Sequence, residues 1–493
     1  MAETVRSLSE LGLRAQGGRE ATVTGLSVDS RQVKPGHLFA ALPGTRMHGG
    51  EFIQYALRME AAAILTDREG AEIAKAELAA STAALIVVED PRQVLAYTAA
   101  LWFGRQPETV VAVTGTSGKT SVATFTRQIW QALGHRAANL GTMGVLGDFT
   151  APLAHTTPEP ITLHRVLRDM AEAGVTHAAM EASSHGLDQG RLDGVRLKAA
   201  AFTNFSQDHL DYHASFDEYF AAKAGLFSRV LPEEGTAVIN IDDPRGREVL
   251  TIARSRGQRI MTVGHDPAAD LRIAAQRFDA TGQDLRFTQG GRPHLVRLAL
   301  IGGFQAENVL AAAGLAMAAG DAPEAVIAAL PGLTTVRGRM ELAAKRDNGA
   351  TVFVDYSHKP GALASALQSL RPHVLGRIVV VFGAGGDRDR LKRPLMGEVA
   401  AKHADVVFVT DDNPRSEDPA AIRAEVMAGC PEATEVGDRA EAILRGVDAL
   451  GPGDALLIAG KGHETGQIVG NDIYPFDDAE QASVAVAALE GRI

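Results

Sequence analysis

A short glycine-rich loop between an apolar strand and an amphipathic helix constrains this chain more than any other feature. Residues 109–113 predict a buried strand, and residues 121–133 predict a helix. The loop that joins them reads Gly115-Thr116-Ser117-Gly118-Lys119-Thr120. In such a loop the backbone N–H groups face an anion, Lys119 adds positive charge, and Thr120 offers its hydroxyl to Mg²⁺. The unit therefore predicts a parallel α/β domain that binds nucleotide phosphates.

The spacing of this loop is shorter than that of the common phosphate loop, because Val113 stands where a glycine is usual. A Gly-Lys-Thr sequence by itself would be an ordinary helix cap. Its position directly after a five-residue apolar strand favours ATP binding over a plain cap.

Polar residues follow two further predicted strands, residues 177–180 and 199–203. Glu181 comes directly after the first, and a segment rich in His and Asp, residues 203–213, follows the second. Mg²⁺ prefers oxygen ligands, and ligands in open α/β sheets bind at the carboxyl ends of strands. We therefore predict metal sites at Glu181 and in the segment that contains His209, with a plain solvated loop as the alternative for that segment.

Charge and cysteine usage exclude several classes of protein. With 49 basic and 60 acidic residues the net charge is −11, which argues against a nucleic-acid binder. The single cysteine, Cys430, permits no internal disulfide, so we expect a cytoplasmic protein and an unreactive thiol. Residues 1–12 lack the apolar core of a secretory signal, and apolar stretches such as residues 309–320 are too short for a membrane span.

The chain is long enough for several domains, and its pattern changes near residues 106 and 333. We predict an α/β protein of three domains: a mixed α/β domain over residues 1–106, a central parallel-sheet ATPase domain of the P-loop type over 107–333, and a Rossmann-like doubly wound domain over 334–493. The last is predicted from strands at residues 352–354, 378–382, 406–410 and 455–458.

Taken together, these motifs resemble the Mur ligases, a family that builds the peptide of bacterial cell-wall precursors, and the resemblance covers nearly the whole chain. The run from Val113 to Thr120 resembles the shortened phosphate loop of that family, and the segments at Glu181 and His209 resemble its metal-binding stretches. The resemblance implies ATP and two Mg²⁺ ions as cofactors.

Lys223, in the segment Tyr219-Phe220-Ala221-Ala222-Lys223, falls where the family carries a carbamylated lysine. Reaction with CO₂ would turn this cation into an anionic oxygen ligand for a second metal ion. On sequence pattern alone, a lysine on an amphipathic helix is a solvated charge. The resemblance implies catalytic roles for Lys119, Lys223 and His209, to which we add Lys392.

Later motifs extend the resemblance toward the nucleotide. The residues that it places around adenine, ribose and the phosphates are Asn308, Arg339, Asp355 and His358. Two positions depart from the family pattern: Gln305 where Asn is usual, and Lys359-Pro360-Gly361 where Thr-Pro-Asp is common.

The last third of the chain carries two polar motifs after strands. Residues 382–394 hold Arg388, Arg390, Lys392 and Arg393 behind a glycine turn, which favours anion contact over a solvated face. The second motif is Asp412-Asn413-Pro414-Arg415. Arginine pairs bidentately with a carboxylate, and Asp412 and Asn413 can accept from an ammonium group, so this motif suits an amino acid.

The motif Asp-Asn-Pro-Arg resembles the signature of those family members that add meso-diaminopimelate rather than lysine. By the same resemblance Arg388, Gly460 and Glu464 would contact this amino acid. The other substrate would be UDP-MurNAc-L-Ala-D-Glu. The residues that would meet it are Ser30, Thr156, Thr157, Ser183, Gln189 and Arg191, for which ordinary turns are also an adequate explanation without the family.

The resemblance implies an ATP-dependent ligase of peptidoglycan biosynthesis that activates a carboxylate as an acyl phosphate and couples it to an amine, acting as a cytoplasmic monomer. A lysine-adding ligase, a folylpolyglutamate synthetase-like ligase and a nucleotide-dependent switch remain as alternatives.

Overall fold

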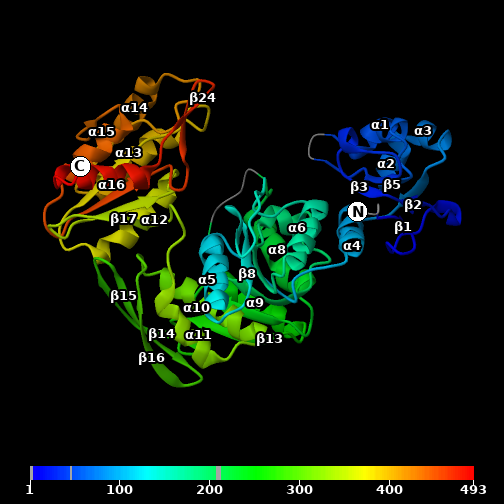
Figure 1. The fold of residues 1–493 in the computed structure, drawn as a ribbon, viewed down its shortest axis with the longest axis horizontal. Helices are drawn as coiled ribbons and strands as arrows, with labels where there is room; N and C mark the ends of the chain where they lie inside the picture. Colours follow the sequence, from blue (N-terminus) through cyan, green and yellow to red (C-terminus); the bar gives the residue numbers. More distant parts are fainter. Residues whose placement is uncertain (1–3, 45–46, 207–211) are drawn as a thin grey trace. The chain divides into compact units, whose positions relative to one another are not determined.

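The computed structural model describes residues 4–44, 47–206 and 212–493, so the predicted metal ligand His209 lies outside the described residues. The chain forms two compact units. One consists of Met1–Leu271 with Leu310–Ile327, and the other of Arg272–Val309 with Ala328–Ile493. Figure 1 shows the strands and helices of both units.

The first unit begins with a small lobe around a parallel sheet of order β3-β4-β5-β6. Its strands are β3 (Gly25–Ser27), β4 (His37–Ala40), β5 (Ala63–Thr66) and β6 (Ala84–Val87), and β1 (Arg6–Ser7) pairs with β2 (Thr22–Val23) beside them. Its helices are α1 (Ile53–Arg58), α2 (Arg68–Ile73), α3 (Lys75–Ala79) and α4 (Pro91–Phe103). Leu38, Leu65 and Ile86 lie in the core of this lobe.

The larger part of the first unit is a parallel sheet in the order β13-β12-β11-β7-β10-β8, with β9 antiparallel at its edge. The strands are β7 (Thr109–Thr114), β8 (Ala137–Gly141), β9 (Gly144–Gly147), β10 (His177–Glu181), β11 (Leu197–Phe202), β12 (Thr236–Asn240) and β13 (Arg259–Gly264). The run from Val110 to Val113 is fully or almost fully buried, as an apolar strand in a sheet covered on both faces must be.

The helices of this part are α5 (Lys119–Ala132), α6 (Pro160–Glu172), α7 (Ser184–Asp188), α8 (Phe216–Gly225), α9 (Pro244–Ser255), α10 (Gln305–Ala319) and α11 (Pro323–Ala329), of which α10 spans both units. Side chains cap α6 and α8: Glu159 and Ser215 accept from backbone N–H groups of the first turn. At α5 the preceding residue is Gly118, and no side chain of the described chain caps that helix. Its N-terminus is therefore suited to bind an anion.

The second unit contains antiparallel strands that were not predicted from the sequence, and a six-stranded sheet of which four strands were predicted. The antiparallel strands are β14 (Leu271–Asp279), β15 (Gly282–Gln289) and β16 (Arg292–Leu298). The six-stranded sheet has the order β17-β18-β22-β19-β20-β21. Its strands are β17 (Glu341–Lys345), β18 (Thr351–Asp355), β19 (Ile378–Phe382), β20 (Val406–Val409), β21 (Thr434–Glu435) and β22 (Ala455–Ala459).

All neighbouring strands of this sheet are parallel except β17 and β18. The helices of this part of the chain are α12 (Pro360–Leu370), α13 (Lys392–His403), α14 (Pro419–Met427), α15 (Arg439–Asp448) and α16 (Asp478–Leu489). A separate antiparallel hairpin consists of β23 (Gly466–Val469) and β24 (Asp472–Pro475). Because β22 lies between β18 and β19, the strand order reverses there, and in open α/β sheets ligands bind at such a reversal.

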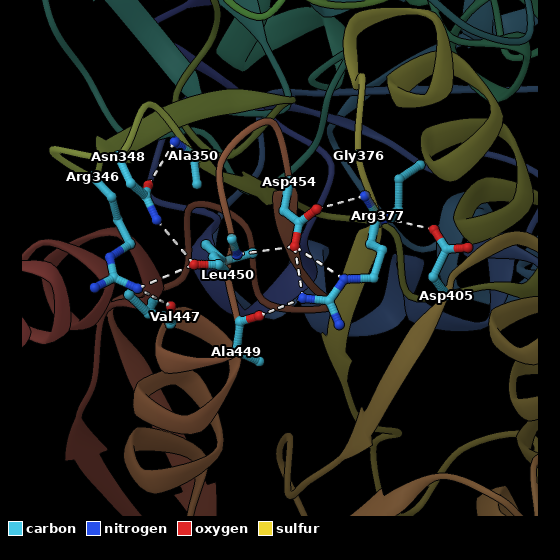
Figure 2. Close-up of polar contacts among 12 residues, drawn as sticks. Arg346, Asn348, Ala350, Gly376, Arg377, Asp405, Val447, Ala449, Leu450 and Asp454 are labelled. Atoms are coloured by element: carbon cyan, nitrogen blue, oxygen red, sulfur yellow. Dashed lines mark hydrogen bonds and ion pairs between the residues drawn. The ribbon is translucent and has the colours of Figure 1, made fainter.

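At the amino ends of these strands, Asp454 joins the loops before β19 and β22 (Figure 2). Its carboxylate accepts from the Arg377 backbone N–H at 2.6 Å and from Arg377 Nη2 at 2.8 Å, as well as from the Gly451 N–H. Burial raises the pKa of Asp454, but these hydrogen bonds outweigh it and lower the pKa below its usual range. These polar contacts stabilise the loops at the amino edge of the sheet. Ligands in open α/β sheets bind at the opposite, carboxyl edge.

The α/β class and the strands predicted from apolar runs are confirmed, and residues 309–320 lie in helix α10. None of the helices within the described ranges has the length and apolar character needed to span a bilayer. Cys430 is buried, and burial raises the pKa of its thiol to about 11. Its sulfur is therefore protonated at neutral pH, as expected for an unreactive thiol.

Candidate functional site

The loop after β7 has the backbone of an anion site. Gly115 and Gly118 have φ angles of +147° and +87°, which residues other than glycine rarely adopt. A Cβ on Gly115 would lie 1.9 Å from Thr203 Oγ1, so the loop tolerates no side chain there. Lys119 Nζ donates to the carbonyl oxygens of Gly115 and Thr116 at 2.9 and 3.0 Å, which holds the ammonium against the loop.

Strand register brings the polar segments to this loop. Glu181 of β10 pairs with Val113 of β7, and Phe202 of β11 pairs with Thr114, so all three strands end at the same level. The segment after β11 then supports the loop directly. Asn204 accepts from the backbone N–H of Thr116 through its carbonyl oxygen and from that of Ser117 through Oδ1, both at 2.9 Å. The sequence analysis did not select Asn204 individually.

Glu181 is 1% exposed and lies beside the start of α5. Its Oε2 accepts from the Thr120 hydroxyl at 2.9 Å, and its Oε1 accepts from the Thr142 N–H at 2.9 Å. A buried carboxylate whose donors are a hydroxyl and an amide has no compensating positive charge from them. Carboxylate and hydroxyl oxygens next to an anion-binding loop fit Mg²⁺, a hard cation that would supply that charge.

Lys223 lies on α8 and is 1% exposed, so the pattern-based expectation of a solvated charge is wrong. Its Nζ donates to the Gly115 carbonyl oxygen at 2.8 Å and lies 4.6 Å from the centre of the Tyr219 ring. Tyr219 OH is in turn 3.2 Å from Thr116 Oγ1. The structure therefore brings Lys223 to the same loop as Lys119.

Residues predicted for the peptide substrate gather behind Glu181. The Thr157 hydroxyl donates to the Glu181 carbonyl oxygen at 2.9 Å, and Arg191 Nη1 donates to the Thr157 carbonyl oxygen at 2.7 Å. Gln189 Oε1 accepts from Arg191 Nη2 at 2.7 Å. Burial lowers the pKa of Arg191 and the neighbouring Arg92 lowers it further, whereas Tyr212 and Glu159 act in the opposite direction.

Three more residues of this predicted set take simple local positions. Thr156 Oγ1 is 3.0 Å from Thr142 Oγ1, and Ser183 Oγ accepts from the Gly186 N–H at the start of α7. Ser30 begins a short 3₁₀ helix in the N-terminal lobe.

A cavity of about 410 Å³ lies at the carboxyl ends of β18, β19, β20 and β22 in the second unit. All six residues predicted to bind the amino acid line this cavity, and so do two other predicted site residues. These are Arg388, Asp412, Asn413, Arg415, Gly460 and Glu464, together with His358 and Lys392. Cationic and anionic groups thus face one small cavity.

Arg415 is held by its backbone as well as by its side chain. Its φ is +53°, its N–H donates to the Ile468 carbonyl oxygen at 3.1 Å, and its Nη1 donates to the Gly386 carbonyl oxygen at 2.8 Å. Asp412 lies against Gly460, where a Cβ would come within 2.5 Å of Asp412 Oδ2. Glycine at position 460 therefore makes room for that carboxylate.

Two expectations for this cavity are wrong. Asn413 was expected to accept from an ammonium group, but its Oδ1 already accepts from Lys461 Nζ at 3.0 Å and from the Ile468 N–H at 2.9 Å. Arg390 and Arg393 were grouped with the cations that meet an anion, but both pair with glutamates. Arg393 is buried against Glu417 and Glu425, and Arg390 pairs with Glu425.

Three of the residues predicted for the nucleotide side, Arg339, Asp355 and His358, lie near the end of β18. The fourth, Asn308, lies on α10. Asp355 accepts from the Met340 N–H at 2.8 Å, and burial raises the pKa of its carboxyl. Arg339 lies 4.9 Å from the centre of the Tyr356 ring.

His358 and Lys392 are linked to each other beside these residues. His358 Nδ1 is 2.8 Å from the Tyr356 carbonyl oxygen, and Lys392 Nζ donates to the His358 carbonyl oxygen at 2.9 Å. Burial lowers the pKa of His358 and that of Lys392. At position 305, where the family pattern has Asn, Gln305 Oε1 accepts from Asn308 Nδ2 at 3.1 Å.

Sequence reasoning missed Asn204, Thr142, Tyr356 and Lys461. Of these, Asn204 and Tyr356 lie within motifs that follow strands, which is a signal that could have selected them. Thr142 and Lys461 also follow strands, β8 and β22, but they act through contacts with residues 39 and 48 positions away in the chain, which the sequence does not show.

Comparison with known proteins gives three family matches along the chain. They are the Mur ligase family catalytic domain at residues 22–102, the Mur ligase middle domain at residues 113–316, and the Mur ligase glutamate ligase domain at residues 338–462.

Individual relatives agree over almost the full length. Two relatives are each 50% identical to this chain over 472 residues: the UDP-N-acetylmuramoyl-L-alanyl-D-glutamate--2,6-diaminopimelate ligases of Bradyrhizobium diazoefficiens and Brucella melitensis. The alignments cover 94% and 95% of this chain, respectively, and 95% of each relative. A solved structure of a ligase of the same name is 33% identical, with a TM-score of 0.75 and 99% of this chain and 100% of that chain covered.

Proposed function

Since this chain belongs to the Mur ligase family, we propose that it is an ATP-dependent ligase that joins meso-2,6-diaminopimelate to UDP-MurNAc-L-Ala-D-Glu in peptidoglycan precursor synthesis. The observation that carries the amino-acid assignment is the 410 Å³ cavity, which presents Arg388 and Arg415 together with Asp412 and Glu464. A zwitterionic amino-acid head needs both kinds of partner at once.

The phosphate loop would hold ATP through its backbone N–H groups and Lys119, and Thr120 and Glu181 would hold Mg²⁺. When bound, ATP supplies the phosphoryl group that activates the acceptor carboxylate as an acyl phosphate, and Mg²⁺ neutralises charge on that group. Lys119 adds a fixed positive charge beside the loop. Asn308, Arg339, Asp355 and His358 are proposed for the adenosine side and the phosphates.

We assign the peptide end of the UDP substrate to the cluster behind Glu181, and its uridine end to the N-terminal lobe near Ser30. Arg191 is suited to a carboxylate of this acidic peptide. Thr156, Thr157, Ser183 and Gln189 offer hydroxyl and amide groups around it. The hydrogen bonds from Arg191 to Gln189 and Thr157 hold the guanidinium in place before substrate binds.

The amide forms in two steps. The acceptor carboxylate takes a phosphoryl group and ADP leaves; the diaminopimelate amine then attacks the carbonyl carbon of the acyl phosphate, and inorganic phosphate leaves with the pair of electrons of the broken C–O bond. The attacking ammonium group loses one proton to become a nucleophilic amine and a second as the amide forms, and the amide nitrogen keeps one N–H. Arg415 and Arg388 orient the distal carboxylate of the amino acid during this attack, and Lys392 adds positive charge in the same cavity.

We further propose that Lys223 is carbamylated and, with His209, holds a second Mg²⁺. Support comes from the burial of Lys223 and its position at the Gly115 carbonyl oxygen, where an anionic group would face the phosphate loop. Because one chain supplies every residue named above, we propose a monomer. We also propose a cytoplasmic location, because ATP and UDP-linked precursors would be its substrates.

The test is ADP release by the purified protein with ATP, Mg²⁺, UDP-MurNAc-L-Ala-D-Glu and meso-diaminopimelate, and with each omitted in turn. Release that requires both the UDP substrate and the amino acid supports the proposal. Release with a folate and glutamate instead, or ATP binding without turnover, would contradict it.

A further inference from the structure

Lys461 follows β22 and is fully buried beside the amino-acid cavity without lining it. A buried ammonium is costly unless its donors are used. Lys461 Nζ donates to Asn413 Oδ1 at 3.0 Å and to Glu464 Oε2 at 3.2 Å. Both of these partners do line the cavity, so the buried cation contacts its walls from behind.

These contacts determine the orientation of the Asn413 amide. Oδ1 accepts both from Lys461 Nζ and from the Ile468 N–H, so a flipped amide would place its NH₂ group against two donors. In the observed orientation Nδ2 donates to Glu464 Oε2 at 2.9 Å. Lys461 thereby fixes which end of the amide faces Glu464.

The same contacts leave Glu464 with one oxygen available. Its Oε2 receives two donors, Lys461 and Asn413, whereas no residue in the described part of the chain donates to Oε1. The Glu464 side chain is 33% exposed and lines the cavity together with Asp412. A carboxylate held in this way can accept from an ammonium group of the bound amino acid.

We infer that Lys461 is a positioning residue for amino-acid specificity: directly and through Asn413, it orients Glu464 toward the ammonium group at the distal centre of a diamino acid whose distal carboxylate meets Arg415. The inference rests on the proposed function. It assigns the choice of amino acid to a buried cation that does not touch substrate, in addition to the residues that line the cavity.

The experiment is steady-state kinetics of Lys461→Met on the full chain, with KM measured separately for diaminopimelate, ATP and the UDP substrate. Methionine keeps the length of the side chain but donates no hydrogen bond. We expect KM for diaminopimelate to rise by about 10- to 100-fold, as for the loss of charged hydrogen bonds, with the other two KM values within about 3-fold of wild type. Lys402→Met, an exposed lysine on α13, is the matched control and should change nothing.

A double-mutant cycle separates positioning from general damage. If Lys461 acts through Glu464, the variant Lys461→Met with Glu464→Gln should raise KM for diaminopimelate no more than Glu464→Gln alone. Additive effects would overturn the inference, as would an unchanged KM in Lys461→Met. If the methionine variant is insoluble, Lys461→Gln, which can still donate to Asn413 Oδ1, is measured in the same cycle. Failure of wild type to use diaminopimelate would instead overturn the proposed function.

Discussion

Thr120 Oγ1 lies 2.9 Å from Glu181 Oε2. Thr120 is in the first turn of α5, which follows β7, and Glu181 is the last residue of β10. Sixty-one residues separate them in the chain, and the parallel pairing of β7 with β10 brings them together. The pair joins the start of α5, an anion site, to a buried carboxylate. A hydroxyl and a carboxylate in this position can hold a hard cation against a phosphate.

Glu181→Gln should lower kcat by about 100-fold or more, because the amide keeps the size of the side chain but removes the negative charge that Mg²⁺ needs and leaves one acceptor oxygen where two are used. The Mg²⁺ concentration for half-maximal rate should rise in the same variant. A Mg²⁺ titration of ADP release measures both quantities. Glu172→Gln, an exposed carboxylate on α6, is the control, and equal behaviour of the two variants would refute a metal role for Glu181.

Lys223→Arg should lower kcat by about 100-fold while the chain remains folded, since a guanidinium keeps the positive charge but does not form a carbamate. Added bicarbonate should raise the rate of wild type prepared without CO₂ and should leave the variant unchanged. ADP release with and without bicarbonate is the measurement. Lys198→Arg, an exposed lysine in β11, should behave as wild type. Full activity of Lys223→Arg would rule out the carbamate.

Much of this site could be predicted from the sequence, because its main parts are local. An apolar strand, a glycine loop and a helix start at Lys119 lie within one run of residues, and polar residues after a strand mark the carboxyl edge of a sheet. The four strands of the last third were recognisable for the same reason.

The remaining features depend on contacts between distant segments. The pattern around Lys223 is that of a solvated helix face, yet the helix buries it against Gly115, 108 residues away. The Asn413 amide could be predicted to line a site, but its orientation depends on Lys461 and on the backbone of Ile468. Strands β15 and β16 are rich in polar residues and contain no continuous apolar run, so they were missed.

Arg415→Lys should raise KM for diaminopimelate by about 10- to 100-fold, because lysine cannot hold the Gly386 carbonyl oxygen and pair bidentately with a carboxylate at the same time. KM for ATP and for the UDP substrate should stay within about 2-fold of wild type, since neither is bound by this motif. Initial rates at varied concentrations of each substrate provide the three values. Arg445→Lys on the surface of α15 serves as the control. An Arg415→Lys enzyme with normal KM for diaminopimelate would argue against the Asp-Asn-Pro-Arg assignment.

Asp454→Asn should destabilise the second unit by about 1–3 kcal/mol at neutral pH, because the Arg377 hydrogen bonds lose their charged acceptor. The pKa of Asp454 is lower in the folded than in the unfolded chain, so its carboxylate contributes stability above the unfolded value, near 3.8, and loses it as the pH falls through the lower folded value.

The difference in unfolding temperature between wild type and Asp454→Asn should therefore be constant above about pH 5 and shrink below about pH 4. Scanning calorimetry across this pH range measures it. Asp472→Asn on the exposed strand β24 is the matched control. A difference that grows toward acid would have the wrong sign for this account.

The most direct test of the central claim is the choice of amino acid. Purified protein with ATP, Mg²⁺ and UDP-MurNAc-L-Ala-D-Glu should be given meso-diaminopimelate and L-lysine in separate reactions, with kcat/KM and the mass of the UDP-linked product determined for each. The arrangement of Arg415, Arg388 and Glu464 around one cavity predicts at least about 100-fold higher kcat/KM for diaminopimelate and a product that carries it, because lysine lacks the carboxylate that the two arginines meet. Equal or better use of lysine, or no product with either amino acid, would contradict the account.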